Sequence, residues 1–361
     1  MRVNFVQYDH AYLKIKDEID RAMQRVLESG DLILRKEVEV FEQNLSTLVG
    51  TKHAIAVANG TDALMLSLRA AGVGQGDEVV TVGHTFHATV EAIVHVGAKP
   101  VLVDVNELGV MDVDKVNDAI TPNTAAIIPV HLMGDMVDMK ALQGIVDVNN
   151  LARNDFQKKI VIIEDACQAL GALWEDKKAG AWGLAAAFSF YPAKILGAAG
   201  DAGAITTNDD ALAVELREMR NHYKGKPGKY GFNSRMDNLQ AAILNVRFRY
   251  LRESLEKRRL CAVMYNDNLF QLPIVLPKYR DGRVWQDYVI RTKHRDALYD
   301  FLKEQGVETM KNDYHFPDDL PKPLATIELE QETLRLPCNA EISPVKQHEV
   351  IFQIKKFYEA M

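Results

Sequence analysis

The sequence predicts an α/β protein with a mostly parallel central sheet flanked by helices, followed by a smaller C-terminal α+β domain. Between residue 54 and about residue 210, short β-rich runs alternate with helical patterns, which is typical of a parallel sheet. Most of these runs are apolar on both faces, as buried strands are. After about residue 235 the alternation stops. We therefore expect a large domain over residues 1–245 and a small domain over residues 246–361.

Each expected element follows from its own pattern of apolar residues. The strands of the central sheet are predicted at 54–58, 78–83, 99–105, 125–131, 159–166, 185–190 and 201–208. Helical patterns that suit crossovers occupy 62–72, 87–97 and 210–222. Before the sheet, two amphipathic helices are expected at 11–29 and 36–48, packed on the sheet or on a partner subunit.

The C-terminal third has a different pattern of apolar residues. A long helical pattern runs from about Arg235 to Leu269 and predicts a connecting helix. Beyond it we expect two strands, within 283–293 and 334–338, and two helices, over 295–306 and 344–361.

Composition excludes several classes of protein. Hydrophobic residues make up 47% and charged residues 26% of the 361 residues, as in an ordinary folded protein. The net charge of −7 includes no Lys/Arg block, which argues against a nucleic-acid partner. No stretch of 18 apolar residues and no secretory signal occurs, and the three cysteines lack the spacing of a disulfide framework or a zinc site. We expect a cytoplasmic protein that binds neither membrane nor metal.

The segment Asn59-Gly60-Thr61-Asp62 is a candidate phosphate site. It follows the strand 54–58 and opens a helix, where free backbone N–H groups and the positive end of the helix dipole converge. Gly60 permits close backbone approach, and Thr61 adds a hydroxyl donor. The alternative is a turn with a helix N-cap that binds nothing.

Polar residues also follow two other predicted strands. Asp165 ends the strand 159–166 and Gln168 follows it, at the kind of edge where α/β sheets collect ligands, although Asp165 taken alone is better explained as a helix N-cap. Ser189 ends another strand, and Lys194 follows it in an apolar, glycine-rich segment. Most lysines are solvated, but one among small apolar residues loses solvation, which lowers its pKa and favours the neutral amine that Schiff-base chemistry requires.

A phosphate anchor, a carboxylate and an amine are the parts that pyridoxal 5′-phosphate (PLP) requires. With these motifs in view, the chain resembles the DegT/DnrJ/EryC1/StrS family of sugar aminotransferases, of PLP fold type I, over nearly its whole length. The motifs occur in the family's order: NGTDAL (59–64), a long stretch at 76–105, IIEDACQALGA (162–172), SFYPAKILGAAGDAGAITTND (189–209) and GFNSRMDNLQAAIL (231–244).

The resemblance implies a role for each candidate residue. Lys194 would carry PLP as a Schiff base and shuttle a proton, and Asp165 would pair with the ring nitrogen. The remaining cofactor contacts would be Gln168 near the phenolic oxygen, Phe86 on the ring face, and Gly60, Thr61, Ser189 and Asn233 at the phosphate. Taken alone, Phe86 is equally explained by core packing and Asn233 by a loop cap.

In the family, Asn233 reaches across from the second subunit, so the resemblance also implies a homodimer with shared active sites. Relatives that remove a sugar hydroxyl carry histidine at the position of Lys194, so this chain is expected to be a transaminase. The expected cycle moves an amino group from an amino acid, L-glutamate, to a keto sugar that is linked to a nucleotide, in amino-sugar or polysaccharide biosynthesis.

Departures from the family pattern fall on the substrate side. Arg35 and Lys36 add positive charge near the expected mouth of the site, and the segment 220–232 differs from the usual one. The family's C-terminal His-Tyr-Pro stretch is reduced to residues 314–317. Two alternatives therefore stay open: a keto acceptor without a nucleotide, such as a cyclitol or a small keto compound, and a PLP-binding regulatory homologue without turnover.

Overall fold

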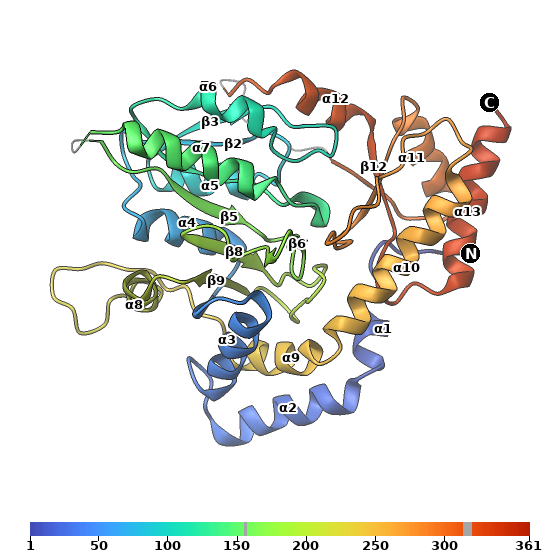
Figure 1. The fold of residues 1–361 in the computed structure, drawn as a ribbon. Helices are drawn as coiled ribbons and strands as arrows, with labels where there is room; N and C mark the ends of the chain where they lie inside the picture. The colour runs from blue at the N-terminus through green and yellow to red at the C-terminus, as the bar shows by residue number, and fades with distance from the viewer. Residues whose placement is uncertain (155–156, 313–319) are drawn as a thin grey trace.

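The structure, a computed structural model, describes residues 1–154, 157–312 and 320–361. Within these residues a seven-stranded sheet has the spatial order β1-β9-β8-β5-β4-β2-β3 (Figure 1). Its strands are β1 (His53–Val57), β2 (Glu78–Val82), β3 (Lys99–Val103), β4 (Thr124–Ile127), β5 (Val161–Asp165), β8 (Ala185–Ser189) and β9 (Gly203–Thr207). All seven predicted strands are confirmed. The sheet is mostly parallel, as predicted, but β9 runs antiparallel to both of its neighbours.

Helices lie on both faces of this sheet and beside it. They are α1 (Tyr8–Leu13), α2 (Lys16–Ser29), α3 (Lys36–Val49), α4 (Gly60–Ala70), α5 (Ala88–His95), α6 (Val116–Ala119), α7 (Met139–Ala152), α8 (Asp210–Met219) and α9 (Asn238–Phe248), with short 3₁₀ turns at Val113–Lys115 and Leu132–Gly134. Helices α1 and α2 lie outside the sheet layer, with α2 packed on α9. Helix α4 packs against α5, α8 and strands β8 and β9, whereas α3 packs against β1 and α9. Helix α7 and the small hairpin of β6 (Leu173–Trp174) and β7 (Lys177–Lys178) were not predicted.

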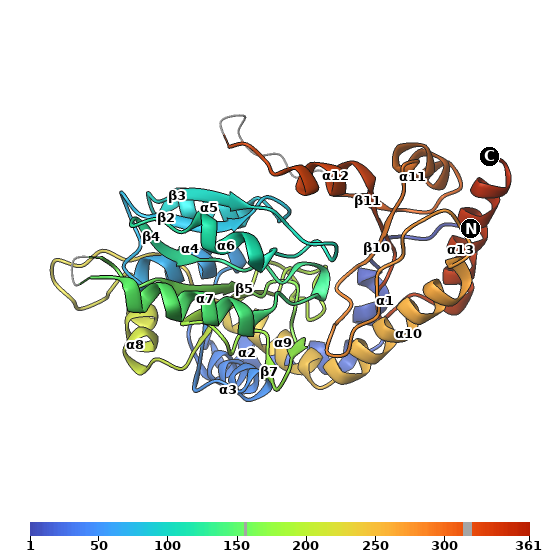
Figure 2. The same cartoon turned by 45° about the horizontal axis from the view of Figure 1, so that its top comes forward.

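The C-terminal third forms a second, smaller layer. Its elements are α10 (Leu251–Leu269), β10 (Tyr288–Arg291), α11 (Arg295–Glu304), β11 (Met310–Lys311), α12 (Leu324–Glu332), β12 (Thr333–Leu336) and α13 (Pro344–Glu359). The three strands pair antiparallel in the order β10-β12-β11, and α13 packs against α10 and α11 beside them (Figure 2).

The prediction of one continuous helix from Arg235 to Leu269 is wrong. The chain forms two helices, α9 and α10, which are separated at Arg249 and Tyr250. This junction contains neither glycine nor proline, so tertiary packing determines the break. Helix α9 packs on α2 and α3, whereas α10 leads to the C-terminal layer and packs on α13.

The apolar core falls into separate clusters. The largest surrounds the seven-stranded sheet, and another fills the C-terminal layer between α10, α11, α13 and the small sheet. Val3 belongs to the C-terminal cluster and forms a bridge with Val307, so the first residues of the chain lie with the smaller layer. The domain boundary at residues 245/246 stays a prediction.

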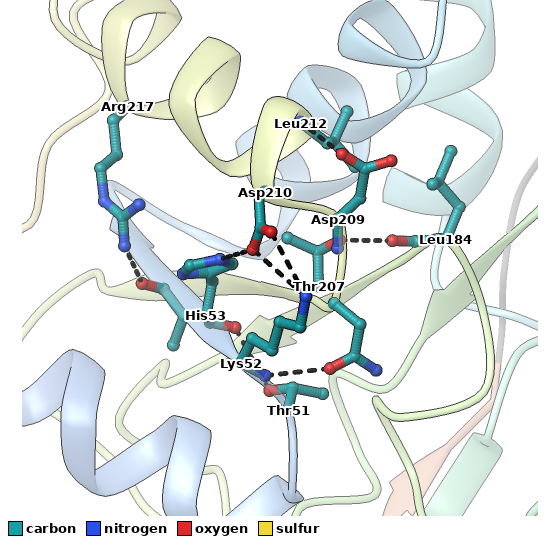
Figure 3. Close-up of polar contacts among 11 residues, drawn as sticks. Thr51, Lys52, His53, Leu184, Thr207, Asp209, Asp210, Leu212 and Arg217 are labelled. Carbon is teal, nitrogen blue, oxygen red and sulfur yellow. Dashed lines mark hydrogen bonds and ion pairs between the residues drawn. The ribbon is translucent and has the colours of Figure 1, made fainter.

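A group of polar contacts fastens the amino-terminal end of β1 to the carboxyl-terminal end of β9 and to α8 (Figure 3). His53 Nε2 lies 2.8 Å from Asp210 Oδ1, and the Thr207 hydroxyl donates to the carbonyl of Leu184 over 2.7 Å. Because β9 is antiparallel, these residues lie at the edge of the sheet opposite to the carboxyl ends of the parallel strands. The contacts hold the edge strand in place and lie away from the candidate site.

Candidate active site

The predicted phosphate turn and Ser189 meet at one edge of the sheet. Gly60 is the first residue of α4, and the Asn59 side chain caps this helix by accepting a hydrogen bond from the backbone N–H of Asp62 over 2.7 Å. A Cβ atom on Gly60 would lie only 2.9 Å from both Ser189 Cβ and Cys167 Sγ. Only glycine permits this approach. The turn is therefore an N-cap and also one wall of a narrow cradle.

Asp165 ends β5 and is buried, with 7% of its surface exposed. One carboxylate oxygen, Oδ2, accepts a hydrogen bond from the Thr89 hydroxyl over 2.8 Å, and Oδ1 accepts one from the backbone N–H of Cys167 over 3.2 Å. No helix follows Asp165 among the next ten residues, so the alternative of a helix N-cap is wrong. The carboxylate is instead fixed in orientation at the edge of the sheet.

A second threonine extends this contact. Thr85 and Thr89 are buried, and their hydroxyl oxygens lie 2.7 Å apart. A carboxylate only accepts hydrogen bonds when it is ionised, so Thr89 donates to Asp165 and Thr85 donates to Thr89. This directed chain ties the loop that carries Phe86 to Asp165.

Lys194 is half-buried in a tight turn, where its backbone N–H donates to the carbonyl of Tyr191 over 2.8 Å. Burial lowers the pKa of the Lys194 amine, whereas the nearby Cys167, Asp287 and Asp165 oppose this shift. The alternative of an ordinary solvated surface lysine is therefore wrong. The amine has the lowered proton affinity that Schiff-base formation requires.

The side chain of Gln286, from the C-terminal layer, contacts both residues next to Lys194. Its Oε1 accepts from the N–H of Ile195 over 3.0 Å, and its Nε2 donates to the carbonyl of Ala193 over 3.1 Å. The sequence does not reveal this residue, because the run 283–293 contains several other polar and charged residues and nothing marks Gln286 as different from them. The sequence does not mark Thr85 and Thr89 as different from their neighbours either.

Gln168 connects two loops that follow neighbouring strands. Its Oε1 accepts a hydrogen bond from the backbone N–H of Met133 over 2.9 Å. Met133 has a φ of 56°, a left-handed conformation that is costly for a side chain of this kind. The bond from Gln168 supports that conformation, so Gln168 shapes the loop beside Asp165.

Three other predicted residues, Phe86, Asn233 and Arg35, are exposed in the structure. The Phe86 side chain is 49% exposed and its ring lies 3.9 Å from the His87 ring, and Asn233 is exposed, so their cofactor roles stay predictions. Arg35 forms a surface ion pair with Asp31 at 3.3 Å, which offsets its charge. Residues 314–317 lie outside the described residues.

A cavity of about 110 Å³ adjoins the Lys194 loop. Arg247 and Arg258 contribute to its lining, and Glu341 is an acidic residue at its wall. In the part of the chain that the structure describes, no carboxylate lies within ion-pair distance of either guanidinium. The cavity carries charges of both signs, and the Arg258 guanidinium also donates to three backbone carbonyls.

Comparisons with known proteins identify the family of this chain. The sequence profile of the DegT/DnrJ/EryC1/StrS aminotransferase family matches residues 13–355. The chain is 40% identical to the pleiotropic regulatory protein of Geobacillus stearothermophilus, over 99% of this chain and 99% of that protein. It is also 40% identical to the dTDP-3-amino-3,4,6-trideoxy-alpha-D-glucose transaminase of Streptomyces venezuelae, over 88% of this chain and 82% of that protein.

A solved structure supports both the fold and the cofactor. NtdA of Bacillus subtilis, solved with its bound cofactor PMP, superposes with a TM-score of 0.90 at 31% identity, over 99% of this chain and 85% of that one. In the described residues, no helix is long and apolar enough to cross a bilayer. Because the profile covers nearly the whole chain, this protein belongs to the DegT/DnrJ/EryC1/StrS family and is a PLP-dependent aminotransferase.

Proposed function

We propose that this aminotransferase moves an amino group from L-glutamate to a keto group, at carbon 3 or carbon 4, of a nucleotide-linked sugar. The observation that carries the proposal is the arrangement of Lys194, Asp165 and the Gly60–Ser189 cradle at one edge of the sheet, in a chain of this family. The name of the Streptomyces venezuelae relative describes a transaminase for a dTDP-linked sugar, which supports an acceptor of that class. The reaction would serve amino-sugar or polysaccharide biosynthesis in the cytoplasm.

The residues present fit PLP. The first turn of α4 and Ser189 leave a narrow cradle that a Cβ atom on Gly60 would fill, which suits a phosphate held by backbone N–H groups. Asp165 presents a fixed carboxylate, and Lys194 an amine of lowered pKa. When bound, PLP supplies an electron sink for the bond that breaks at the amino-bearing carbon.

Each residue then has a role. Lys194 would hold the cofactor and act as the general acid and base, for which its lowered pKa provides a neutral amine. Asp165 would keep a proton on the ring nitrogen. Thr61 would complete the phosphate cradle, Gln168 would contact the phenolic oxygen and Phe86 would cover one face of the ring.

The amino donor is proposed to be an acidic amino acid because of the charge beside Lys194. Arg247 lines the adjoining cavity, and its guanidinium would attract a carboxylate. Donor profiling checks this: L-glutamate should exceed L-alanine as donor by at least about tenfold in kcat/KM, a difference of roughly 1.4 kcal/mol. Equal rates with both donors would contradict it.

The assembly is proposed to be a homodimer in which Asn233 of each subunit reaches the phosphate of the other site. Its support is the family membership together with the exposure of Asn233 on the single chain.

Substitution of Lys194 tests the central role. Lys194→Ala should lose amino transfer by roughly 10²–10⁴-fold or more, because the proton shuttle is gone. Borohydride treatment of the wild type should fix the cofactor on the peptide that contains Lys194, and mass spectrometry would locate it. Lys293→Ala, which removes an exposed lysine, is the control and should retain full activity. An active Lys194→Ala enzyme would rule out the assignment.

The same purified protein is used to test the identity of the keto acceptor and the alternative of a regulatory homologue. Amination of a keto sugar only when it carries a nucleotide supports the proposal, whereas equal amination of a cyclitol ketone would favour an acceptor without a nucleotide. A protein that binds PLP but exchanges no amino group with any donor would behave as a regulatory homologue.

A further inference from the structure

The backbone on both sides of Lys194 is held by one side chain from the C-terminal layer. Gln286 is 4% exposed and lies just before β10, some ninety residues beyond Lys194 in the chain. Its carboxamide accepts from the N–H of Ile195 over 3.0 Å and donates to the carbonyl of Ala193 over 3.1 Å. A carboxamide carries a donor and an acceptor in one plane, as a backbone peptide does, so Gln286 acts like a neighbouring strand toward residue 194.

Gln286 is itself rigidly held. Arg258, a buried residue of α10, donates through Nη1 to the carbonyls of Gln286 over 2.9 Å, Trp285 over 3.2 Å and Cys338 over 2.8 Å. The next residue, Asp287, is buried and forms an ion pair with Arg335 at 2.6 Å. The position of the Gln286 carboxamide is therefore set by α10 and the small sheet and not by the loop that it holds.

Other hydrogen bonds hold the ends of the Lys194 loop, where the N–H of Ala198 donates to the carbonyl of Phe190 over 2.7 Å and the N–H of Ala199 donates to the Gln240 side chain over 2.9 Å. The N–H of Lys194 closes the turn to Tyr191, and the segment beyond it is rich in glycine and alanine. The bonds at the ends of the loop lie four or more residues from Lys194, so the direction of the Lys194 side chain depends on contacts to the peptide groups directly beside it. Gln286 supplies two of them.

We propose that Gln286 is a positioning residue, whose carboxamide aims Lys194 by fixing the peptide groups on both sides of it. The inference rests on the proposed role of Lys194. A small displacement of a catalytic amine slows the chemical step far more than it weakens binding, because proton transfer requires a specific distance and alignment.

The experiment compares two buried glutamines of the C-terminal layer. Gln286→Met keeps the length of the side chain but removes both hydrogen bonds. The control is Gln347→Met, since Gln347 is also 4% exposed and donates to a backbone carbonyl, that of Cys261, over 2.6 Å. Both variants lose one buried carboxamide, but only the first loses contact with the Lys194 loop. Both are compared with wild type for thermal unfolding, cofactor content, kcat and KM.

We expect Gln286→Met to lower kcat by about 10–100-fold with KM for the donor changed by less than about threefold, and Gln347→Met to leave kcat within about twofold. The pH titration of the visible absorbance of the lysine-bound cofactor should also shift in Gln286→Met alone. The charged and titratable groups near the Lys194 amine, which are unchanged in both variants, are Cys167, Asp287, Asp165 and Arg335.

Gln286→Glu provides a second variant if the methionine variant unfolds at the assay temperature. The carboxylate keeps the acceptor for Ile195 but loses the donor for Ala193, so a reduced kcat is expected here too. Wild-type kcat and an unshifted titration in the folded Gln286 variants would overturn the inference. Borohydride trapping separates this result from failure of the proposed function: cofactor fixed on Lys194 in wild type leaves the role of Lys194 standing, whereas cofactor fixed elsewhere or nowhere refutes that role first.

Discussion

The carboxylate of Asp165 is held by residues that contribute no charge of their own. A backbone N–H and a threonine hydroxyl fix its two oxygens, and the second hydroxyl, on Thr85, orients the first. Each oxygen of the Asp165 carboxylate accepts one of these hydrogen bonds and can accept a second, so the carboxylate keeps free acceptor capacity toward the edge of the sheet. At the scale of single residues, short buried hydroxyls therefore determine where the Asp165 carboxylate points.

Loss of the Thr89 hydroxyl should weaken this control. Thr89→Val keeps the shape but leaves Asp165 Oδ2 without its donor, which costs about 1–3 kcal/mol for a charged partner. We expect weaker PLP binding by at least about tenfold, measured by absorbance titration of the apoprotein. Thr89→Ser, which restores the hydroxyl, should recover most of the affinity; equal affinities for the valine and serine variants would contradict the role of this bond.

His84 makes the stability of the protein depend on pH. Its ring is buried, and Nδ1 donates to the carbonyl of Gly109 over 2.9 Å, which requires a hydrogen on that nitrogen. Burial lowers the pKa of His84 to about 4, opposed by the bond to Gly109 and reinforced by the nearby charges of Arg291 and Lys322. The folded protein thus keeps the imidazole neutral in a range where the unfolded chain protonates it.

Stability should consequently fall as pH decreases through the window from about 6.5 to about 4, since only the unfolded state binds the proton there. Between pH 7.5 and pH 5 this residue should contribute a loss of about 2 kcal/mol. His84→Asn keeps a donor near Nδ1 and does not titrate. Urea unfolding at both pH values should show a smaller loss for this variant, and parallel losses for both proteins would refute the assignment.

At the scale of elements, the start of α4 shows how a helix N-terminus becomes a binding cradle. The helix begins where β1 ends, Asn59 caps it, and the chain passes so close to β8 that only Gly60 fits against Ser189. Gly203, at the start of β9, approaches Asn59 even more closely, because a Cβ atom on Gly203 would lie 2.3 Å from the Asn59 carbonyl. Three strands therefore converge on one turn.

Gly60→Ala should open this cradle. The new methyl group would lie 2.9 Å from Ser189 Cβ and Cys167 Sγ, so α4 and β8 must separate. We expect PLP affinity to fall by at least about tenfold, with some loss of thermal stability from overpacking, about 1–3 kcal/mol. Gly144→Ala in α7 is the control: no atom lies within 4 Å of the added Cβ, and a gain of about 0.5–1 kcal/mol is expected. Unchanged PLP affinity in Gly60→Ala would contradict the assignment of the cradle.

At the scale of the whole molecule, the two layers are joined close to the site. Asp135, which is 2% exposed, forms ion pairs with Arg280 at 2.5 Å and Arg283 at 2.9 Å, and the carbonyl of Gly134 accepts from the N–H of Val284 over 3.1 Å. The segment that leads into Gln286 is thus anchored to the large sheet. Together with the bond from Arg258, this anchor fixes the Gln286 carboxamide relative to the Lys194 loop.

The proposed homodimer makes a prediction at the same scale. In mixtures of Lys194→Ala and Asn233→Ala subunits, half of the dimers at random assembly are hybrids, and each hybrid has one site with both native residues. Activity should then reach about a quarter of the wild-type value, above the sum of the separate variants. Light scattering would verify the dimer. No recovery in verified hybrid dimers would show that Asn233 does not act across the interface.

The sequence alone determined the seven strands, their boundaries within a few residues, and the family. These features depend on local patterns: apolar runs for the strands, and Gly60, Asp165, Ser189 and Lys194 at their ends. Tertiary structure alone decided the antiparallel direction of β9, the break between α9 and α10, and the partners of the site residues. Thr89 meets Asp165 across 76 positions, and Gln286 meets Ile195 across 91. No periodicity encodes such contacts, because they arise only when elements that are distant in the sequence pack against one another.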